Sequence, residues 1–170
     1  LVIKRRLWPA LARVPLDGGR TWRGRRWLGE NKTLRGVVVM VIATTIFALI
    51  EGELWRRFEW ARSISPVNYA EVPPLRWGLL LGFGYVLGEL PNSFLKRQLD
   101  IPPGGSTRGG MGVIFWLADQ LDSLIGVLVA IAMVWVPPWP VVVTMVAVTL
   151  IVHPAVALLM YVLGLKTRIG

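Results

Sequence analysis

Four long apolar runs, separated by charged or proline-rich segments, dominate the chain. They cover about residues 36–58, 75–95, 111–136 and 139–163, and each is as long as the roughly 20 residues that a helix needs to cross a bilayer. The second run contains four glycines that allow a neighbouring helix to approach closely: Gly78, Gly82, Gly84 and Gly88. The pattern predicts an all-α, polytopic integral membrane protein with four transmembrane helices and no internal repeat.

Two prolines lie inside these runs. Pro91 predicts a kink in the second run, and the pair His153-Pro154 predicts an interruption of the fourth. His153 is the only histidine of the chain, and it fits either a packing or hydrogen-bonding residue or a catalytic group.

Residues 1–35 form a basic arm ahead of the first run, which leaves residues 36–170 as the transmembrane domain. The arm holds ten of the nineteen Lys and Arg residues against only Asp17 and Glu30. Its apolar stretch, 7–16, is too short to cross a bilayer as a helix and contains two prolines. We expect the arm to lie in the headgroup region, anchored by Trp8, Trp22 and Trp27.

Composition supports a membrane protein, and the distribution of charge predicts its orientation. The hydrophobic fraction is 54%, the mean hydropathy is +0.56, and the absence of cysteine excludes thiol chemistry. The net charge of +9 lies at the membrane edges, so we expect no nucleic-acid partner. If both termini lie on one side, that side holds fifteen of the nineteen basic residues, and the positive-inside rule places it in the cytoplasm. The predicted location is the cell membrane, with both termini and the active site cytoplasmic.

Three acids lie inside the apolar runs: Glu89, Asp119 and Asp122. Counted from the ends of their runs at roughly 1.5 Å per residue, they reach similar depths of about 10 to 16 Å. The spacing of Asp119, Asp122 and Ser123 places all three on one helix face. Carboxylates gathered in a low-dielectric cavity favour a hard cation, so the sequence predicts a Mg2+ site. Ion pairs with Lys or Arg are the alternative, which we favour less because no basic residue lies within the runs themselves.

Basic and glycine-rich segments flank these acids on the cytoplasmic side. Lys96-Arg97 fits a polyphosphate site, although such pairs also mark the cytoplasmic end of a span. The loop 102–110 is compatible with a phosphate cradle and equally with a flexible linker. The segment 31–33, which precedes the first run, fits either an anion site at a helix N-terminus or an ordinary N-cap with snorkelling charges.

These motifs, taken together, resemble the signature of the CTP-dependent phosphatidate cytidylyltransferase superfamily. The similar elements are Gly88-Glu89-x-x-Asn92-Ser93-x-x-Lys96-Arg97, then Pro103-Gly104, then Asp119-Gln120-x-Asp122-Ser123, with Lys32-Thr33-x-x-Gly36 ahead of the first run. Glu at 89, Gln at 120 and the short loop look more like the archaeal branch, the CDP-archaeol synthase family. That family usually has a further N-terminal span, so four or five helices both stay open.

The resemblance implies a reaction and a set of site residues. The reaction joins CTP to an isoprenoid glycerol phosphate lipid, unsaturated archaetidic acid, and gives CDP-archaeol and pyrophosphate with Mg2+ as cofactor. The resemblance implies that Glu89, Asp119 and Asp122 hold the metal, and that Lys96 and Arg97 act with the two aspartates in catalysis. The remaining substrate-binding residues that we predict are Asn31, Lys32, Thr33, Asn92, Ser93, Pro103, Gly104 and Ser123.

Two other classes of function remain as alternatives. In a cation-coupled membrane transporter the buried acids and His153 would form a relay, but such a protein would not need the loop cations beside the acids. A structural membrane subunit would leave the acids unexplained.

Overall fold

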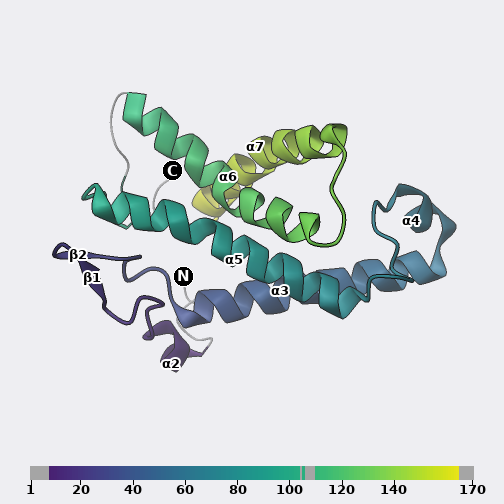
Figure 1. The fold of residues 1–170 in the computed structure, drawn as a ribbon, viewed down its shortest axis with the longest axis horizontal. Helices are drawn as coiled ribbons and strands as arrows, with labels where there is room; N and C mark the ends of the chain where they lie inside the picture. The colour runs from purple at the N-terminus through teal and green to yellow at the C-terminus, as the bar shows by residue number, and fades with distance from the viewer. Residues whose placement is uncertain (1–7, 104, 106–109, 165–170) are drawn as a thin grey trace.

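The computed structural model of the 170-residue chain describes residues 8–103, 105 and 110–164. Its four long helices are α3 (Leu34–Arg57), α5 (Pro74–Gln98), α6 (Gly110–Ala132) and α7 (Trp139–Val162). The shorter elements are helix α2 (Pro9–Ala12), the antiparallel strands β1 (Thr21–Trp22) and β2 (Arg25–Arg26), and helix α4 (Glu59–Ile64). In Figure 1 the β1–β2 hairpin lies beside one end of α5, and α4 lies at the opposite end of the bundle. The predicted mostly helical architecture is confirmed.

α3 begins at a side-chain cap. Thr33 has an extended backbone and its hydroxyl accepts a hydrogen bond from the Gly36 N–H at 3.4 Å, as an N-cap residue does. The arm is tied to this point, because the Leu16 N–H donates to the Lys32 carbonyl at 2.8 Å. The N-cap interpretation of Thr33 is therefore correct, and the cap fixes Lys32 at the start of the helix.

α5 is the central helix, and it packs along both α3 and α6 (Figure 1). Its glycines make both contacts close. A Cβ at Gly82 would lie 2.8 Å from the Val41 Cα of α3, and a Cβ at Gly84 would lie 2.7 Å from the Ala130 Cβ of α6. Both distances are too short for a side chain, so glycine at these positions lets three helices meet nearly backbone to backbone. α7 packs against α6.

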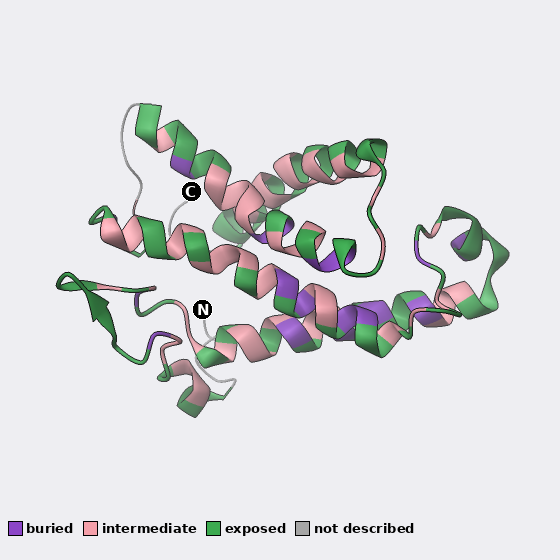
Figure 2. Ribbon diagram, viewed as in Figure 1, coloured by how far each residue is buried: buried purple, intermediate pink, exposed green. Residues whose placement is uncertain are grey.

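Most of the large apolar side chains face outward. The buried core is small and lies toward the α4 end, where Ala48, Val67, Trp77 and Ile131 pack together. α7 contains no buried residue, and Figure 2 shows exposed positions along the outer faces of the long helices. An apolar exterior around a small core is the arrangement that lipid contact requires.

Three of the long helices, α3, α6 and α7, are long and apolar enough to cross a membrane. These three support a multi-pass membrane protein. α5 has 25 residues and is as long as the others, but within the described chain it is not among the candidate spans.

The predicted limits of the runs agree with α3, α5 and α7 to within three residues. The third limit was wrong, because α6 ends at Ala132 and not near 136. The residue before a proline avoids helical geometry, and Pro137 and Pro138 end the segment early. The interruption predicted at Pro154 was also wrong, since α7 continues through it; a proline inside a helix removes only one backbone donor. α5 also continues through Pro91, and the kink predicted there stays a prediction.

Candidate active site

A buried aspartate organises the arm. The Asp17 side chain is 0% exposed and accepts hydrogen bonds from the backbone N–H groups of Gly19, Leu28 and Gly29 at 3.0 to 3.2 Å. Arg26 adds a hydrogen bond at 2.6 Å. Burial raises the pKa of Asp17, but Arg26 and the backbone donors outweigh this effect and lower the pKa to about 2. A permanent carboxylate therefore holds 17–29 in one conformation.

The hairpin is docked onto the end of α5. Arg25 pairs with Asp100 and donates to the Gln98 carbonyl, and the Gln98 amide donates to the Arg26 carbonyl at 3.3 Å. These contacts join residues more than 70 positions apart. They bring the basic arm next to the Lys96-Arg97 pair.

Gly29 is the point where several predicted motifs meet. A Cβ at Gly29 would lie 3.3 Å from each of three atoms: Arg97 Cδ, Asn31 Oδ1 and Pro103 Cγ. Its φ of +88° also favours glycine. The segment before α3, the end of α5 and the proline-rich loop, which are far apart in sequence, therefore converge on the arm.

Asp119 and Asp122 lie one turn apart on α6, and Asn92 of α5 joins them. The Asn92 Nδ2 is 2.8 Å from Asp119 Oδ1 and 2.8 Å from Asp122 Oδ2, so two carboxylate oxygens approach one point. The Ser123 N–H donates to Asp122 Oδ1 at 2.6 Å. Gly88 and Gly126 let α5 and α6 come together here, because a Cβ at Gly88 would lie 2.8 Å from the Gly126 N.

Lys96 occupies the other side of Asp119. Its Nζ lies 2.5 Å from both carboxylate oxygens, and its side chain is only 11% exposed. The ammonium also lies 5.7 Å from the centre of the Phe115 ring, within range of a cation–π contact. Neighbouring Arg97 has Nε and Nη1 buried, and neither atom has a hydrogen-bond partner among the residues that the structure describes.

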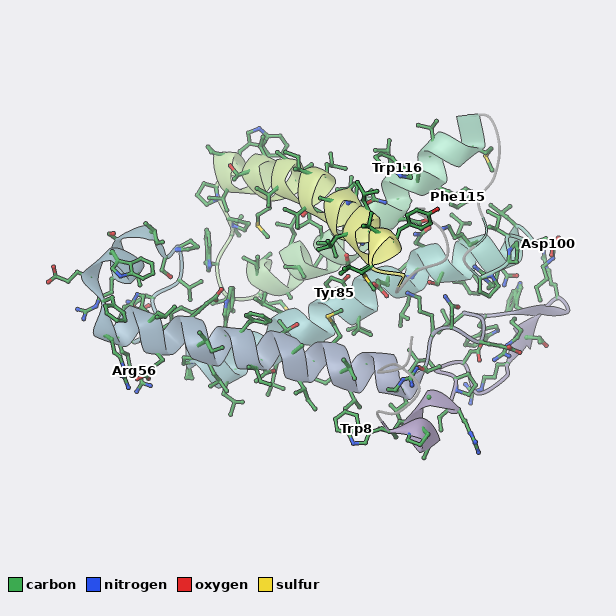
Figure 3. The ribbon with its side chains drawn as sticks, turned by 180° about the vertical axis from the view of Figure 1, so that it is seen from behind. Trp8, Arg56, Tyr85, Asp100, Phe115 and Trp116 are labelled. Atoms are coloured by element: carbon green, nitrogen blue, oxygen red, sulfur yellow. The ribbon has the colours of Figure 1, made fainter. Side chains whose placement is uncertain are left out.

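Glu89 lies one turn before Asn92 on α5 and pairs with Lys32. Tyr85, one turn earlier, brings its hydroxyl close to the side chains of Glu89 and Ser123. Figure 3 shows Tyr85 between the two ends of the bundle, which are marked by Arg56 and Asp100. Glu89, Lys32 and Tyr85 line a cavity of about 190 Å³ at the start of α3.

Two larger hollows adjoin these side chains. A groove of about 390 Å³ lies between the hairpin and Pro103 and is lined by Arg25, Arg26 and Arg97, with Glu30 and Asp100 on its walls. A second groove, of about 650 Å³, runs between α5 and α6. It is lined mainly by apolar side chains such as Leu87 and Ile125, and both Asn92 and Asp122 line it as well.

The reason given above for disfavouring ion pairs was wrong. Lys96 belongs to the last turn of α5 and reaches Asp119, and Lys32 reaches Glu89 from the arm, so both acids are ion-paired. Moreover, in the part of the chain that the structure describes, no three acidic or histidine side chains are grouped closely enough to hold one ion. Asp119 and Asp122 converge, whereas Glu89 has a separate partner.

Comparison with known proteins identifies the family. A family model described as CarS-like: CDP-archaeol synthase matches residues 12–169. The CDP-archaeol synthase of Methanospirillum hungatei is 31% identical over 161 residues, which cover 90% of this chain and 87% of that protein. The CDP-archaeol synthase of Haloarcula marismortui is 37% identical over 163 residues, covering 91% of this chain and 82% of that protein.

The chain belongs to the CDP-archaeol synthase family. A solved structure, described as an intramembrane enzyme for archaeal membrane lipids biosynthesis, agrees with this: its TM-score is 0.58 and its identity 27%, over 89% of this chain and 85% of that one. The protein is therefore an enzyme, a CTP-using cytidylyltransferase of archaeal lipid synthesis. The family predicted from the motifs is confirmed, and the transporter alternative is not favoured.

The donor chemistry of the site fits the metal that the family resemblance implies. Asp119 and Asp122 offer carboxylate oxygens, and the Asn92 side chain carries an amide oxygen as well as the nitrogen that contacts them. Carboxylate and amide oxygens are ligands of the kind that Mg2+ prefers. The point between the two aspartates already accommodates a hydrogen-bond donor, the Asn92 amide, and Asp119 also accepts from the Lys96 ammonium on its other side. Mg2+ at this point stays a prediction.

The structure places two of the other predicted residues near the site, does not describe a third, and places His153 on a different helix. Ser93 follows Asn92 on α5 and is half-buried, and Ser123 is buried at 4% exposure beside Asp122. Gly104 lies outside the described residues. His153 lies on α7, far along the chain from the α5–α6 contact.

Sequence reasoning missed Tyr85 and Asp17. Tyr85 stands four residues before Glu89, the helical spacing that places two side chains on one face. Asp17 was visible as an acid among arginines beside Gly18-Gly19, a turn-forming pair.

Proposed function

We propose that this family member transfers the cytidylyl group of CTP, with Mg2+, to unsaturated archaetidic acid, 2,3-di-O-geranylgeranylglyceryl phosphate. The products are CDP-archaeol and pyrophosphate. The observation that carries the proposal is the contact of Asn92 with both Asp119 and Asp122, with Lys96 on Asp119, beside an apolar groove that Asn92 and Asp122 line.

The groove between α5 and α6 supports a lipid substrate. Its walls are almost wholly apolar, and Asn92 and Asp122 are the polar residues that line it. A lipid chain lying along Leu87 and Ile125 would bring its phosphate to these side chains. With α5 and α6 in the bilayer, as we propose, the substrate would enter this groove sideways from the lipid.

The groove beside the hairpin supports a polyphosphate. Three guanidinium groups line it, those of Arg25, Arg26 and Arg97, and Arg97 has donors that no described residue satisfies. Guanidinium groups bind phosphate oxygens through paired hydrogen bonds, so this groove suits the β- and γ-phosphates of CTP. Lys96, which contacts Asp119, is next to Arg97 in sequence.

The chemistry needs no protein base. The lipid phosphate is already an anion, and one of its oxygens forms the new bond to the α-phosphorus of CTP while the bond from that phosphorus to the β-phosphate bridge breaks and pyrophosphate leaves. Lys96 and Arg97 offset the charge that gathers on the leaving phosphates, and the rigid arm aligns them. When bound, Mg2+ supplies further charge neutralisation at the phosphates. Asp119, Asp122 and Asn92 would hold it, and Glu89 would have to leave Lys32 and approach them to serve as the further predicted ligand.

The basic arm and the positive-inside rule support an active site at the cytoplasmic surface. The described arm, 8–33, packs against the end of α5 that bears Lys96 and Arg97, so this end of the bundle carries the excess of positive charge. We propose that α5 spans the membrane as the fourth helix, with its polar residues shielded by α3 and α6.

The test uses purified protein in lipid vesicles with lipid phosphate and CTP labelled at the α-phosphate. Label passing into the lipid fraction, with release of pyrophosphate and dependence on Mg2+, is the expected result. Asp122→Asn should lower the rate by about 100-fold or more, the usual loss when one group that stabilises the transition state is removed. Glu51→Gln is the matched control, since Glu51 is an acid at the opposite end of the bundle with Tyr69 as its partner. A rate for D122N close to the wild-type rate would refute the metal role, and no transfer by the wild type would refute the proposed reaction.

A further inference from the structure

Each predicted nucleotide-binding lysine is paired with a predicted metal-binding acid. Lys96 contacts both oxygens of Asp119, and Lys32 contacts Glu89. The lysine side chains are 11% and 21% exposed, so neither ammonium is simply solvated. The charge pairs that Arg25 and Arg26 of the arm make, Arg25–Asp100, Arg26–Asp17 and Arg26–Glu30, involve no acid of the predicted metal site.

These pairs set up a competition for the same atoms. Asp119 Oδ1 already accepts from Asn92 and Lys96, and Asp119 Oδ2 accepts from Lys96. A carboxylate oxygen that coordinates a divalent cation has to give up such contacts, so a cation at Asp119 displaces the Lys96 ammonium. A displaced ammonium in a partly buried site is costly without a new anion.

The phosphates of the nucleotide are the anion within reach. Lys96 stands beside Arg97, which lines the basic groove, and its flexible four-carbon chain can swing the ammonium without moving the helix. Lys32 lies at the N-terminus of α3, where helix amides also favour an anion. Both lysines therefore have a second partner available as soon as CTP binds.

We propose that Lys96 and Lys32 exchange Asp119 and Glu89 for nucleotide phosphates, and that this exchange makes divalent-cation binding and CTP binding depend on each other. The inference rests on the proposed function, because it takes the same acids as metal ligands. By linkage, CTP strengthens cation binding by the same factor as the cation strengthens CTP binding. The lysines thereby hold the acids when no cation is bound and prevent tight cation binding before the nucleotide arrives.

Opposite shifts in two affinities test the exchange. Mn2+ serves as the probe cation, and its binding to the purified protein in a neutral detergent is measured from the electron paramagnetic resonance of free Mn2+, with and without CTP and without lipid. In Lys96→Met the competing ammonium is gone, so Mn2+ should bind about three- to tenfold more tightly without CTP, a modest factor because Asp119 is 43% exposed and solvent screens the pair. CTP should bind more weakly, and its effect on Mn2+ affinity should shrink.

Arg97→Met is the matched control, because it removes one positive charge from the adjacent position, and the Nε and Nη1 of Arg97 have no hydrogen-bond partner among the described residues. It should weaken CTP binding but change Mn2+ affinity without CTP by less than about twofold. Equal tightening of Mn2+ in R97M and K96M would mean general electrostatics and would overturn the exchange, as would unchanged or weaker Mn2+ binding in K96M.

A second variant and a parallel assay keep the outcome clear. Lys96→Gln, which keeps a hydrogen-bond donor on a slightly shorter side chain, carries the same expectation if K96M is poorly folded. Wild-type transfer of label to lipid phosphate is measured alongside: an inactive wild type would count against the proposed function, whereas an active wild type without the opposite shifts would count against the exchange alone.

Discussion

Replacing Gly84 by alanine separates the role of helix packing from that of the site residues. The new Cβ would lie 2.7 Å from the Ala130 Cβ and 2.8 Å from the Gly126 carbonyl oxygen. Carbon atoms pack best at about 3.5 to 4.0 Å, so α5 and α6 must move apart by about 1 Å. Gly84 lies eight residues before Asn92, which is roughly 12 Å along the same helix.

The movement should reach the site. A shift of about 1 Å would lengthen the 2.8 Å contacts from Asn92 to both aspartates beyond the range of a hydrogen bond. A misplacement of this size costs about 100-fold in rate, and overpacking of this kind costs about 1 to 3 kcal/mol of stability. We therefore expect Gly84→Ala to lower kcat strongly and the melting temperature moderately, although Gly84 touches no substrate.

The assay measures label transfer from CTP to lipid phosphate together with thermal unfolding in detergent. Adding Ala130→Gly removes the nearer of the two clashing atoms and should restore part of both losses. Gly110→Ala serves as the control, because no atom of the described residues lies within 4 Å of a Cβ there. Wild-type kcat in G84A, or no rescue by A130G, would refute the link between close packing and catalytic geometry.

Two further substitutions test the arm and the residue that the sequence did not reveal. Asp17→Asn should lower the melting temperature at pH 7, because an amide cannot accept all the hydrogen bonds that the carboxylate accepts. In the wild type the folded pKa of Asp17, about 2, lies below the ordinary 3.8. The stabilisation by this carboxylate is therefore complete above about pH 4 and is lost as the pH falls toward 2. Glu30→Gln, an exposed partner of the same Arg26, should change little, and equal losses in both variants would contradict the role of Asp17. Tyr85→Phe should lower kcat several-fold with little change in melting temperature, because its hydroxyl lies close to Glu89 and Ser123 at the site. Tyr69→Phe removes a similar hydroxyl–glutamate contact at the other end of the bundle, so equal kinetic effects would show that Tyr85 has no special role.

Helix positions were predictable because they follow from local composition. The apolar runs gave α3, α5 and α7 to within three residues, since a membrane-length run of apolar residues has few other structures open to it. The motifs gave the family and also the residues that meet at Gly29. The error at the end of α6 arose because hydropathy does not register the restriction that Pro137 places on the residues before it.

Partners of the acids were not predictable in the same way. Whether Lys32 reaches Glu89 depends on how the arm folds back, and that fold depends on Asp17 collecting donors from residues as far away as Gly29. Counting basic residues inside the apolar runs overlooked Lys96, one residue beyond the predicted limit at 95 in a helix that continues to Gln98, and it overlooked the reach of its side chain. The sequence specified which charges exist, but their pairing is a property of the tertiary fold.

The composition of α5 unites these observations. α5 is not among the candidate membrane spans because its composition lowers its mean hydropathy. It contains the glycines that let it approach α3 and α6, and the polar residues Glu89, Asn92 and Lys96. Yet the same features are needed for a site inside a membrane: a bulkier helix would hold Asn92 away from Asp119, and a more apolar one would carry no ligands. In the proposed function α5 combines both properties, and α3 and α6 flank it. It follows that substitutions raising the hydropathy of α5 should improve its membrane insertion and impair the reaction, whereas the same substitutions in α7 should leave the reaction intact.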